Sequence, residues 1–137
     1  MNKLIIHTDG GARGNPGPAA IGAILATEDG EIVAEISRVI GRATNNQAEY
    51  QAVVAALDKA SALKAQELHF YLDSELVVKQ LNREYKVKNK ELIPLFVSVY
   101  NKTLQFKKVK FTHIPREQNK AADALVNQAL DKKIMGN

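Results

Sequence analysis

The sequence predicts an α/β fold, and three observations support this. Strand-like apolar patterns fill the first third of the chain, and helical patterns then alternate with strand patterns to its end. The 137 residues, 45% apolar and 25% charged, have the composition of a globular protein that buries one core. No internal repeat, low-complexity tract or linker interrupts the pattern, so we expect a single domain over residues 1–137.

The first third of the chain contains three predicted strands. The first ends at Asp9, and the other two are separated by a Glu-Asp-Gly turn signal typical of a hairpin. The predicted strands cover residues 3–9, 20–27 and 31–40. A segment with four glycines and two prolines, residues 10–18, is expected to form the loop between the first two strands.

The remaining elements follow from cap and breaker signals. Thr44 and Gln47 fit a capping box, which predicts a helix from there to about residue 63. Ser74 can cap a short helix, and Pro94 is tolerated in the first turn of a later one. The remaining predicted segments are strands 67–73 and 107–114, helices 74–81, 91–106 and 120–133, and loops 82–90 and 115–119. The predicted order is β-β-β-α-β-α-α-β-α.

The helix between the first and fourth strands favours parallel pairing of these two strands. Asp9 and Asp73 end them, so the two carboxylates would lie near the carboxyl ends of neighbouring strands. The strand axes would then be roughly 5 Å apart. Ligand sites in open α/β sheets favour that edge.

Four acidic residues lie in segments that otherwise look built for burial: Asp9, Glu49, Asp73 and Asp123. A carboxylate in apolar surroundings is costly unless it is paired or binds a cation, and these segments contain no matching set of basic residues. Taken singly, Asp73 could cap a helix, and Asp123 could be a solvated first-turn residue that favours the helix dipole. As a set, the four carboxylates predict a divalent metal site and a hydrolytic enzyme.

The composition narrows the compartment and the partner. The absence of cysteine excludes disulfides and thiolate metal ligands, and it fits a reducing compartment. No apolar run reaches the length of a membrane span or a signal-peptide core, so we expect a cytoplasmic protein with no membrane partner. The net charge of +4 is compatible with an anionic partner, although many soluble domains are mildly basic.

The glycine-rich segment has two interpretations. Its backbone at Gly10 and Gly11 could approach a phosphate closely, or the segment could be a tight structural turn. It leads into a strand and contains no Gly-Lys-Ser/Thr, so it is neither a Walker loop nor a dinucleotide fingerprint. The polar residues at the predicted helix start likewise have two interpretations. Thr44, Asn45 and Asn46 could bind an anion, or they could simply cap the helix.

Four segments in this order resemble type 1 ribonuclease H, and the resemblance covers essentially the whole chain. They are Thr-Asp-Gly-Gly-Ala-Arg-Gly-Asn-Pro-Gly-Pro at 8–18, Thr-Asn-Asn-Gln-Ala-Glu at 44–49, Leu-Asp-Ser at 72–74 and Pro-Arg-Glu-Gln-Asn-Lys-Ala-Ala-Asp at 115–123. The resemblance implies a five-stranded mixed sheet flanked by helices. It also implies an endonuclease that cuts the RNA strand of RNA–DNA hybrids with two Mg²⁺ or Mn²⁺ ions, leaving a 3′-hydroxyl and a 5′-phosphate.

The resemblance also implies roles for individual residues. The metal ligands correspond to Asp9, Glu49, Asp73 and Asp123, with Asp9 shared by both ions. The contacts to the hybrid backbone correspond to Asn15, Thr44, Asn45 and Asn46. Oxygen ligands suit Mg²⁺, and polar contacts to 2′-hydroxyls would distinguish RNA from DNA without reading the base sequence.

The chain departs from the family pattern at two places. His113 stands ten residues before Asp123, like a histidine that many members carry, but no glycine flanks it; Arg116 could take its role instead, and we favour Arg116 because it lies in the loop leading to Asp123. The chain has no tryptophan and only a short basic segment where some members carry a Trp-containing protrusion that grips DNA. The basic residues of that segment could contact DNA phosphates or be simply solvated: Arg83, Lys86, Lys88 and Lys90.

The resulting prediction is a monomeric, metal-dependent hybrid ribonuclease. One alternative is a nuclease of the same fold with a wider substrate range that includes double-stranded RNA. Another is a non-catalytic nucleic-acid-binding domain of this fold. The four carboxylates argue against a pure binding module, because so much negative charge would repel phosphates.

Overall fold

The computed structural model describes residues 2–135; residues 1, 136 and 137, the ends of the predicted domain, lie outside the described residues. The elements follow the predicted order, with one additional 3-10 turn. They are β1 (Lys3–Ala12), β2 (Gly17–Thr27), β3 (Ile32–Ala43), α1 (Asn45–Ala62), β4 (Glu67–Leu72), α2 (Glu75–Leu81), α3 (Ile93–Thr103), β5 (Lys108–His113), the 3-10 turn η1 (Arg116–Gln118) and α4 (Lys120–Met135). The predicted α/β class is confirmed.

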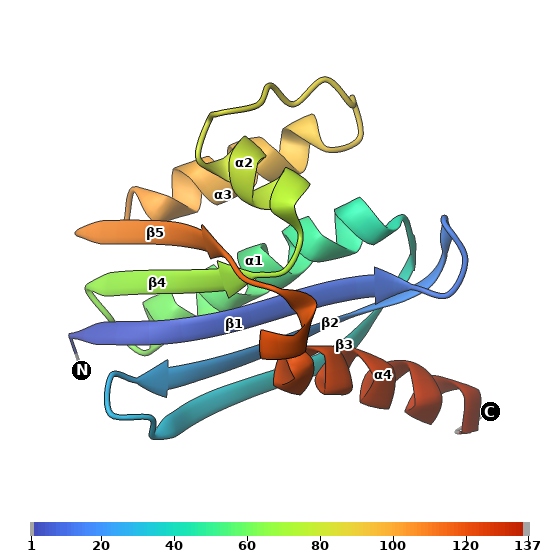
Figure 1. Cartoon of the computed structure of the whole chain (residues 1–137), viewed down its shortest axis with the longest axis horizontal. Helices are drawn as coiled ribbons and strands as arrows, with labels where there is room; N and C mark the ends of the chain where they lie inside the picture. Colours follow the sequence, from blue (N-terminus) through green and yellow to red (C-terminus); the bar gives the residue numbers. More distant parts are fainter. Residues whose placement is uncertain (1, 136–137) are drawn as a thin grey trace.

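The five strands form one mixed sheet in the order β3-β2-β1-β4-β5 (Figure 1). Short connections make the first three strands antiparallel neighbours. The chain then crosses over through α1, so β4 lies parallel to β1, as expected from the helical connection. β5 adds to β4 in the same direction. This arrangement places β1 in the middle of the sheet, with the carboxyl ends of β1 and β4 at the same edge.

Helices cover the sheet on both faces: α1 lies behind it and α4 in front of β2 and β3 in Figure 1. Alternate residues of each strand face the α1 side, and these form the main core with the apolar face of α1 and with α2 and α3. Its largest fully buried side chains include Tyr50, Phe70, Leu4, Ile6, Leu25, Leu57, Leu68 and Leu72. A smaller cluster under α4 consists of Ala20, Val126, Ala129 and Leu130.

The starts of α1 and α2 are fixed locally. The Thr44 hydroxyl accepts a hydrogen bond from the Gln47 amide at 3.1 Å, and the Gln47 side chain accepts one from the Thr44 amide at 2.8 Å. The predicted capping box is therefore confirmed. The Ser74 hydroxyl likewise accepts from the Val77 amide at 3.3 Å, so Ser74 rather than Asp73 caps α2.

The glycine-rich segment is mostly strand, and the predicted loop over residues 10–18 is wrong in its bounds. β1 continues three residues beyond Asp9, and β2 already begins at Gly17. The hairpin ladder continues through these positions, with Gly11 opposite Ala20. Only residues 13–16 remain as the connection. Glycine was read as a loop signal, but a paired neighbouring strand supplies the backbone partners that keep it extended.

Smaller differences in bounds also occur. α3 is shorter than predicted because residues 91–92 and 104–106 form turns, and the predicted loop 115–119 contains η1. Across residues 2–135, no helix combines the length and apolar character that crossing a membrane requires.

Candidate active site

A cleft of about 520 Å³ opens where the carboxyl ends of β1 and β4 meet the first turns of α1 and α4. It contains all four carboxylates that the sequence singled out. Its walls are formed by Asp9, Gly10, Gly11, Ala12, Arg13, Asn45, Asn46, Glu49, Asp73, Ser74, Arg116, Asp123, Val126, Asn127 and Leu130. Segments from both ends of the chain therefore meet at one place.

Three of the carboxylates form a compact cluster. Asp9, Glu49 and Asp73 each offer an oxygen, and these oxygens all lie within 4.8 Å of one another. β1 pairs with β4 as far as His7 opposite Tyr71, and continuing this register by two residues sets Asp9 level with Asp73. Asp9 and Glu49 are only 7% and 5% exposed. The parallel pairing thus brings together two groups that are 64 residues apart, as their numbers give.

Glu49 reaches this cluster because α1 packs unusually close to β1 at Gly10. A Cβ atom at Gly10 would lie 2.2 Å from the backbone carbonyl carbon and oxygen of Ala48, so there is no room for a side chain at this position. The close approach lets the Gly10 amide donate a hydrogen bond to Glu49 Oε1 at 2.8 Å. The Gly10 amide is therefore bonded within the protein and does not make the phosphate contact that the sequence suggests. Gly10 and Gly11 both line the cleft.

Asp123 comes from the first turn of α4, which approaches the opposite face of the sheet. The close contact here is at Gly22, the partner of Asp9 on β2, where a Cβ atom would lie 2.4 Å from the carbonyl oxygen of Ala122. Asp123 is half-buried, and Asn127 Nδ2 donates to its Oδ2 at 3.4 Å. It lines the cleft beside the cluster and is not one of the three mutually close carboxylates.

Asn119 is a site residue to which the sequence analysis gave no role. Its side chain is 1% exposed, and Nδ2 donates to the Thr8 carbonyl at 2.9 Å and to Asp73 Oδ2 at 3.3 Å. Its backbone carbonyl also accepts from the Asp123 amide at 3.1 Å. Asn119 therefore ties the end of β1, Asp73 and the start of α4 together. The available signal was its position in the segment that leads to Asp123.

The electrostatics of the cluster match its burial. Removal from water raises the pKa of Asp9 to about 6; the adjacent Glu49 side chain opposes the rise, and the neighbouring Asp73 and Asp123 add to it. Burial, followed by the adjacent Asp9, holds the pKa of Glu49 well above its usual range. Within the described chain, no salt bridge involves any of the four carboxylates. Arg13 and Arg116 also line the cleft, but neither forms a salt bridge with the four carboxylates, so the site concentrates negative charge that no ion pair in the described chain offsets.

These features fit a hard divalent cation. The donors are carboxylate oxygens, which Mg²⁺ and Mn²⁺ prefer. Glu49 Oε2 is buried and has no hydrogen-bond partner among residues 2–135, although a buried carboxylate oxygen normally has one. A cation held by Asp9, Glu49 and Asp73 would supply the missing partner and offset the repulsion among the three groups.

The rim of the cleft carries carboxamides at the start of α1. Asn45 Oδ1 accepts from the Ala12 amide at 2.8 Å, and Asn15 Oδ1 accepts from the Asn45 amide at 3.0 Å. These bonds use the acceptor side of each carboxamide and orient it. Asn46 lines the cleft, whereas the Thr44 hydroxyl is used as the helix cap and Thr44 is not part of the lining.

Arg116 and His113, the two candidates for assisting catalysis beside Asp123, lie in different places in the structure. Arg116 lies on η1, is exposed and lines the cleft. His113 is exposed at the end of β5, opposite Leu72, and is not part of the cleft lining. The geometry therefore favours Arg116.

The chain is similar in sequence to known proteins over most of its length. A protein-family model described as "Reverse transcriptase-like" matches residues 7–129. A bifunctional protein of Mycobacterium tuberculosis is 45% identical over 130 residues, which are 94% of this chain and 36% of that protein. The chain thus spans about a third of the length of this relative. A ribonuclease H of Clostridium botulinum is 35% identical over 150 residues, with 96% of this chain and 98% of that protein covered.

Solved structures show the same fold. Ribonuclease H1 of Halobacterium salinarum superimposes with a TM-score of 0.93 at 44% identity, covering 96% of this chain and 99% of that one. A ribonuclease H1 isolated from compost, solved in complex with an RNA/DNA hybrid, gives a TM-score of 0.92 at 43% identity, with the same coverage.

Proposed function

This chain belongs to the ribonuclease H family, and from its cleft we infer that it hydrolyses the RNA strand of RNA–DNA hybrids with the help of divalent metal ions. The observation that carries this proposal is the cluster of Asp9, Glu49 and Asp73 in an open cleft, which makes no salt bridge with any residue of the range 2–135. The compost enzyme, which resembles this chain over almost its whole length, was solved with such a hybrid. A pure binding module would have no use for clustered carboxylates beside phosphates.

The proposal assigns the metal to the four carboxylates. Asp9, Glu49 and Asp73 would hold one Mg²⁺ or Mn²⁺ ion, and Asp123 would help Asp9 to hold a second. When bound, the ions activate a water nucleophile and stabilise the charge that develops on the departing 3′ oxygen. Water attacks the phosphorus, the bond to the 3′ oxygen breaks, and that oxygen takes up a proton, leaving a 3′-hydroxyl and a 5′-phosphate.

The protein's own residues position the reactants. Gly10 and Asn119 hold Glu49 and Asp73 in place through the hydrogen bonds described above. We assign the contacts to the hybrid backbone to the polar groups of Gly11, Asn15, Asn45 and Asn46. Contacts of this kind position the hybrid without reading its base sequence. In this proposal the chain acts as a cytoplasmic monomer, and its molar mass by light scattering tests the monomeric state.

A cleavage assay tests the proposal. Labelled RNA–DNA hybrid, double-stranded RNA and duplex DNA are each incubated with the protein and Mg²⁺, Mn²⁺ or a chelator. We expect cleavage of the RNA strand of the hybrid with either ion and none with chelator, with end analysis giving 3′-hydroxyl products. Equal cleavage of double-stranded RNA would replace hybrid specificity with a broader ribonuclease activity, and no metal-dependent cleavage of any substrate would overturn the enzyme assignment.

Replacing Asn45 and Asn46 together by Ala is expected to raise KM for the hybrid by roughly 5- to 30-fold. Each lost hydrogen bond to a 2′-hydroxyl is worth on the order of 1 kcal/mol. Steady-state kinetics measure the change, and thermal unfolding serves as the control because Thr44 still caps α1. An unchanged KM would mean that the two side chains serve only the start of the helix.

Arg116→Ala is expected to lower kcat by roughly tenfold, less than the 10²-fold or more typical of general acid–base groups, because Arg116 is exposed. The guanidinium stays charged, so the pH–rate profile should keep its shape near neutrality. His113→Ala, outside the cleft lining, is expected to remain close to wild type. The opposite result, a large kcat loss in His113→Ala with Arg116→Ala close to wild type, would assign the role to His113.

A further inference from the structure

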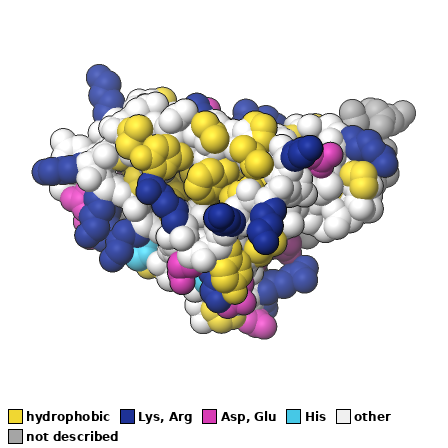
Figure 2. Space-filling model, turned by 90° about the horizontal axis from the view of Figure 1, so that it is seen from above, with side chains coloured by type: hydrophobic (Ala, Val, Ile, Leu, Met, Phe, Trp, Pro, Cys, Tyr) yellow, Lys and Arg dark blue, Asp and Glu magenta, His cyan; other side chains and the backbone are white. Residues whose placement is uncertain are grey.

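Helix α3 and the residue that follows it carry a row of apolar side chains that the described chain leaves partly exposed. One side of the helix packs on the core through Val99, whereas Ile93, Val97, Tyr100 and Leu104 on the other side are 40%, 46%, 40% and 67% exposed. Figure 2 looks onto this side of the molecule and shows hydrophobic side chains gathered there with Lys and Arg around and among them. We call the four exposed residues the α3 seam.

The spacing of the seam is that of a helix-packing stripe. Its residues follow one another at intervals of four, three and four, which is the a/d repeat of a coiled coil, from the first residue of α3 to Leu104 at its C-cap. Grooves of about 320 and 460 Å³ lie along it, and both include Arg83 and Phe96 in their linings. A ridge with a groove beside it is the surface into which the side chains of a second helix pack.

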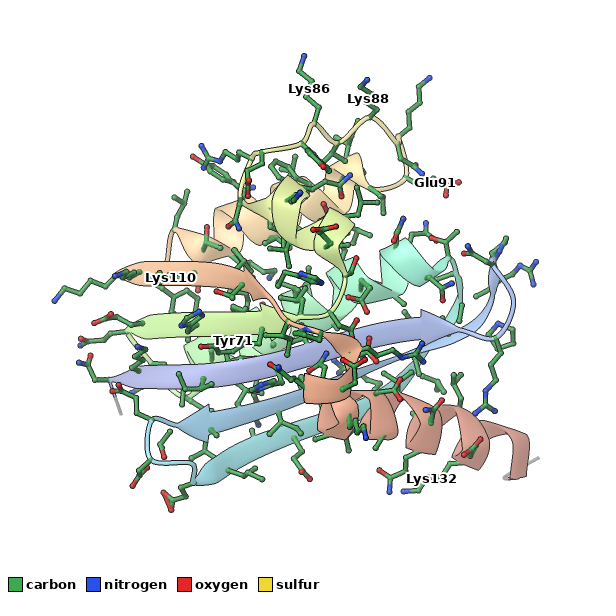
Figure 3. All side chains as sticks on the ribbon, in the orientation of Figure 1. Tyr71, Lys86, Lys88, Glu91, Lys110 and Lys132 are labelled. Atoms are coloured by element: carbon green, nitrogen blue, oxygen red, sulfur yellow. The ribbon has the colours of Figure 1, made fainter. Side chains whose placement is uncertain are left out.

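The charges around the seam are mainly of one sign. The linings of the two grooves contain Arg83, Lys86, Lys107 and Lys108, against a single carboxylate, Glu84. In the described part of the chain, none of the four basic residues makes a salt bridge. The Arg83 guanidinium lies 4.6 Å from the centre of the Tyr100 ring, so a positive charge is held against the seam itself. Figure 3 shows Lys86 and Lys88 projecting outward from the loop above α2.

We propose that the α3 seam binds an acidic amphipathic helix of a partner protein, which lays apolar residues on the seam and places Asp or Glu opposite Arg83, Lys107 and Lys108. Charge complementarity identifies this occupant, because a second copy of this chain would bring the same positive charges together. The aliphatic character of Ile93, Val97 and Leu104 fits a protein helix better than a phosphate backbone. The seam shares no residue with the cleft lining, so the partner would bind without covering the active site.

Three labelled helical peptides test the proposal by fluorescence anisotropy. All carry Leu at the a and d positions, and their flanking positions are all Glu, all Gln or all Lys. The Glu peptide is expected to bind the full chain at least about tenfold more tightly than the Gln peptide, with the Lys peptide weakest. Equal or reversed affinities, or no binding of the Glu peptide, would overturn the proposal.

Variants localise the binding. The double variant Val97→Ser with Leu104→Ser is expected to bind the Glu peptide about tenfold or more weakly than the wild type does, while it cleaves the hybrid at the wild-type rate. Ile32→Ser, which removes an equally exposed apolar side chain from β3, is the matched control and should have no effect. Lys107→Gln with Lys108→Gln should reduce the preference for Glu over Gln flanks, whereas Lys132→Gln on α4 should not.

Other occupants give distinguishable results. If Val97→Ser with Leu104→Ser abolishes a concentration-dependent dimer of the free chain, the seam is a self-association surface and the proposal fails. If a DNA oligonucleotide displaces the Glu peptide and its own binding weakens in Lys107→Gln with Lys108→Gln, the surface serves nucleic acid and the proposal also fails.

Discussion

Asp9→Asn is expected to abolish turnover of RNA–DNA hybrid, with a loss in kcat on the order of a thousandfold or more, about 4 kcal/mol in the barrier. Asp9 lies at the centre of the carboxylate cluster, and in our proposal it contacts both ions. The amide has the same shape but lacks the charge that would hold them. Single-turnover cleavage with saturating Mg²⁺ measures the effect, and Asp58→Asn, which alters only an ion pair with Lys102 outside the cleft, is the control.

The same variant is expected to be more stable than the wild type without metal at neutral pH. Burial raises the pKa of Asp9 to about 6, so the folded state holds this proton more tightly than the unfolded chain, whose carboxyl titrates near 3.8. The stability of the metal-free wild type should therefore fall as pH rises through this interval and stay low above it. At pH 7 the variant should gain on the order of 3 kcal/mol, because it never has to carry the buried charge.

Denaturant unfolding at several pH values in the presence of chelator checks this prediction. Added Mg²⁺ should stabilise the wild type more than Asp9→Asn, so the difference in unfolding free energy between the two proteins should become smaller. If Asp9→Asn keeps a turnover within tenfold of the wild-type value, Asp9 is not a metal ligand. Equal stability of the two proteins at pH 7 would show that burial does not disfavour the charge.

Gly10→Ala is expected to destabilise the fold by about 3 kcal/mol and to lower kcat by on the order of a hundredfold. The new methyl group would lie 2.2 Å from the Ala48 backbone, so β1 or α1 must move. Either movement breaks the hydrogen bond that holds Glu49 beside Asp9. Denaturant unfolding and kinetics under conditions where the variant is folded measure the two effects separately.

Gly11→Ala is the matched control for stability. A Cβ atom at Gly11 would lie 3.6 Å from the Val126 side chain, an ordinary contact, so the change in unfolding free energy should stay within about 0.5 kcal/mol. Equal destabilisation by the two substitutions would mean that strand conformation, rather than the close approach of α1, requires glycine at position 10.

The sequence alone determined the features that depend on near neighbours. The cap at Thr44 and the cap at Ser74 act within three residues of their partners, so both helix starts could be read directly. Apolar patterns located the five strands, although not the end of β1 or the start of β2, and the helix between the first and fourth strands implied their parallel pairing. The carboxylates at 9, 49, 73 and 123 could be singled out because a charge in an apolar segment requires a partner.

Only the tertiary structure decided how these parts fit together. Gly10 reads as a loop residue until α1, 39 residues away at Glu49, is seen packed against it. Asn119 reads as an ordinary polar residue until its side chain meets the Thr8 carbonyl, 111 residues earlier in the chain. The sequence already favours Arg116 over His113, and the structure adds that Arg116 lines the cleft whereas His113 does not; which of them assists catalysis stays a prediction. Sequence patterns record the preferences of a segment for its local conformation, whereas the distance between two elements is fixed only when their surfaces pack together.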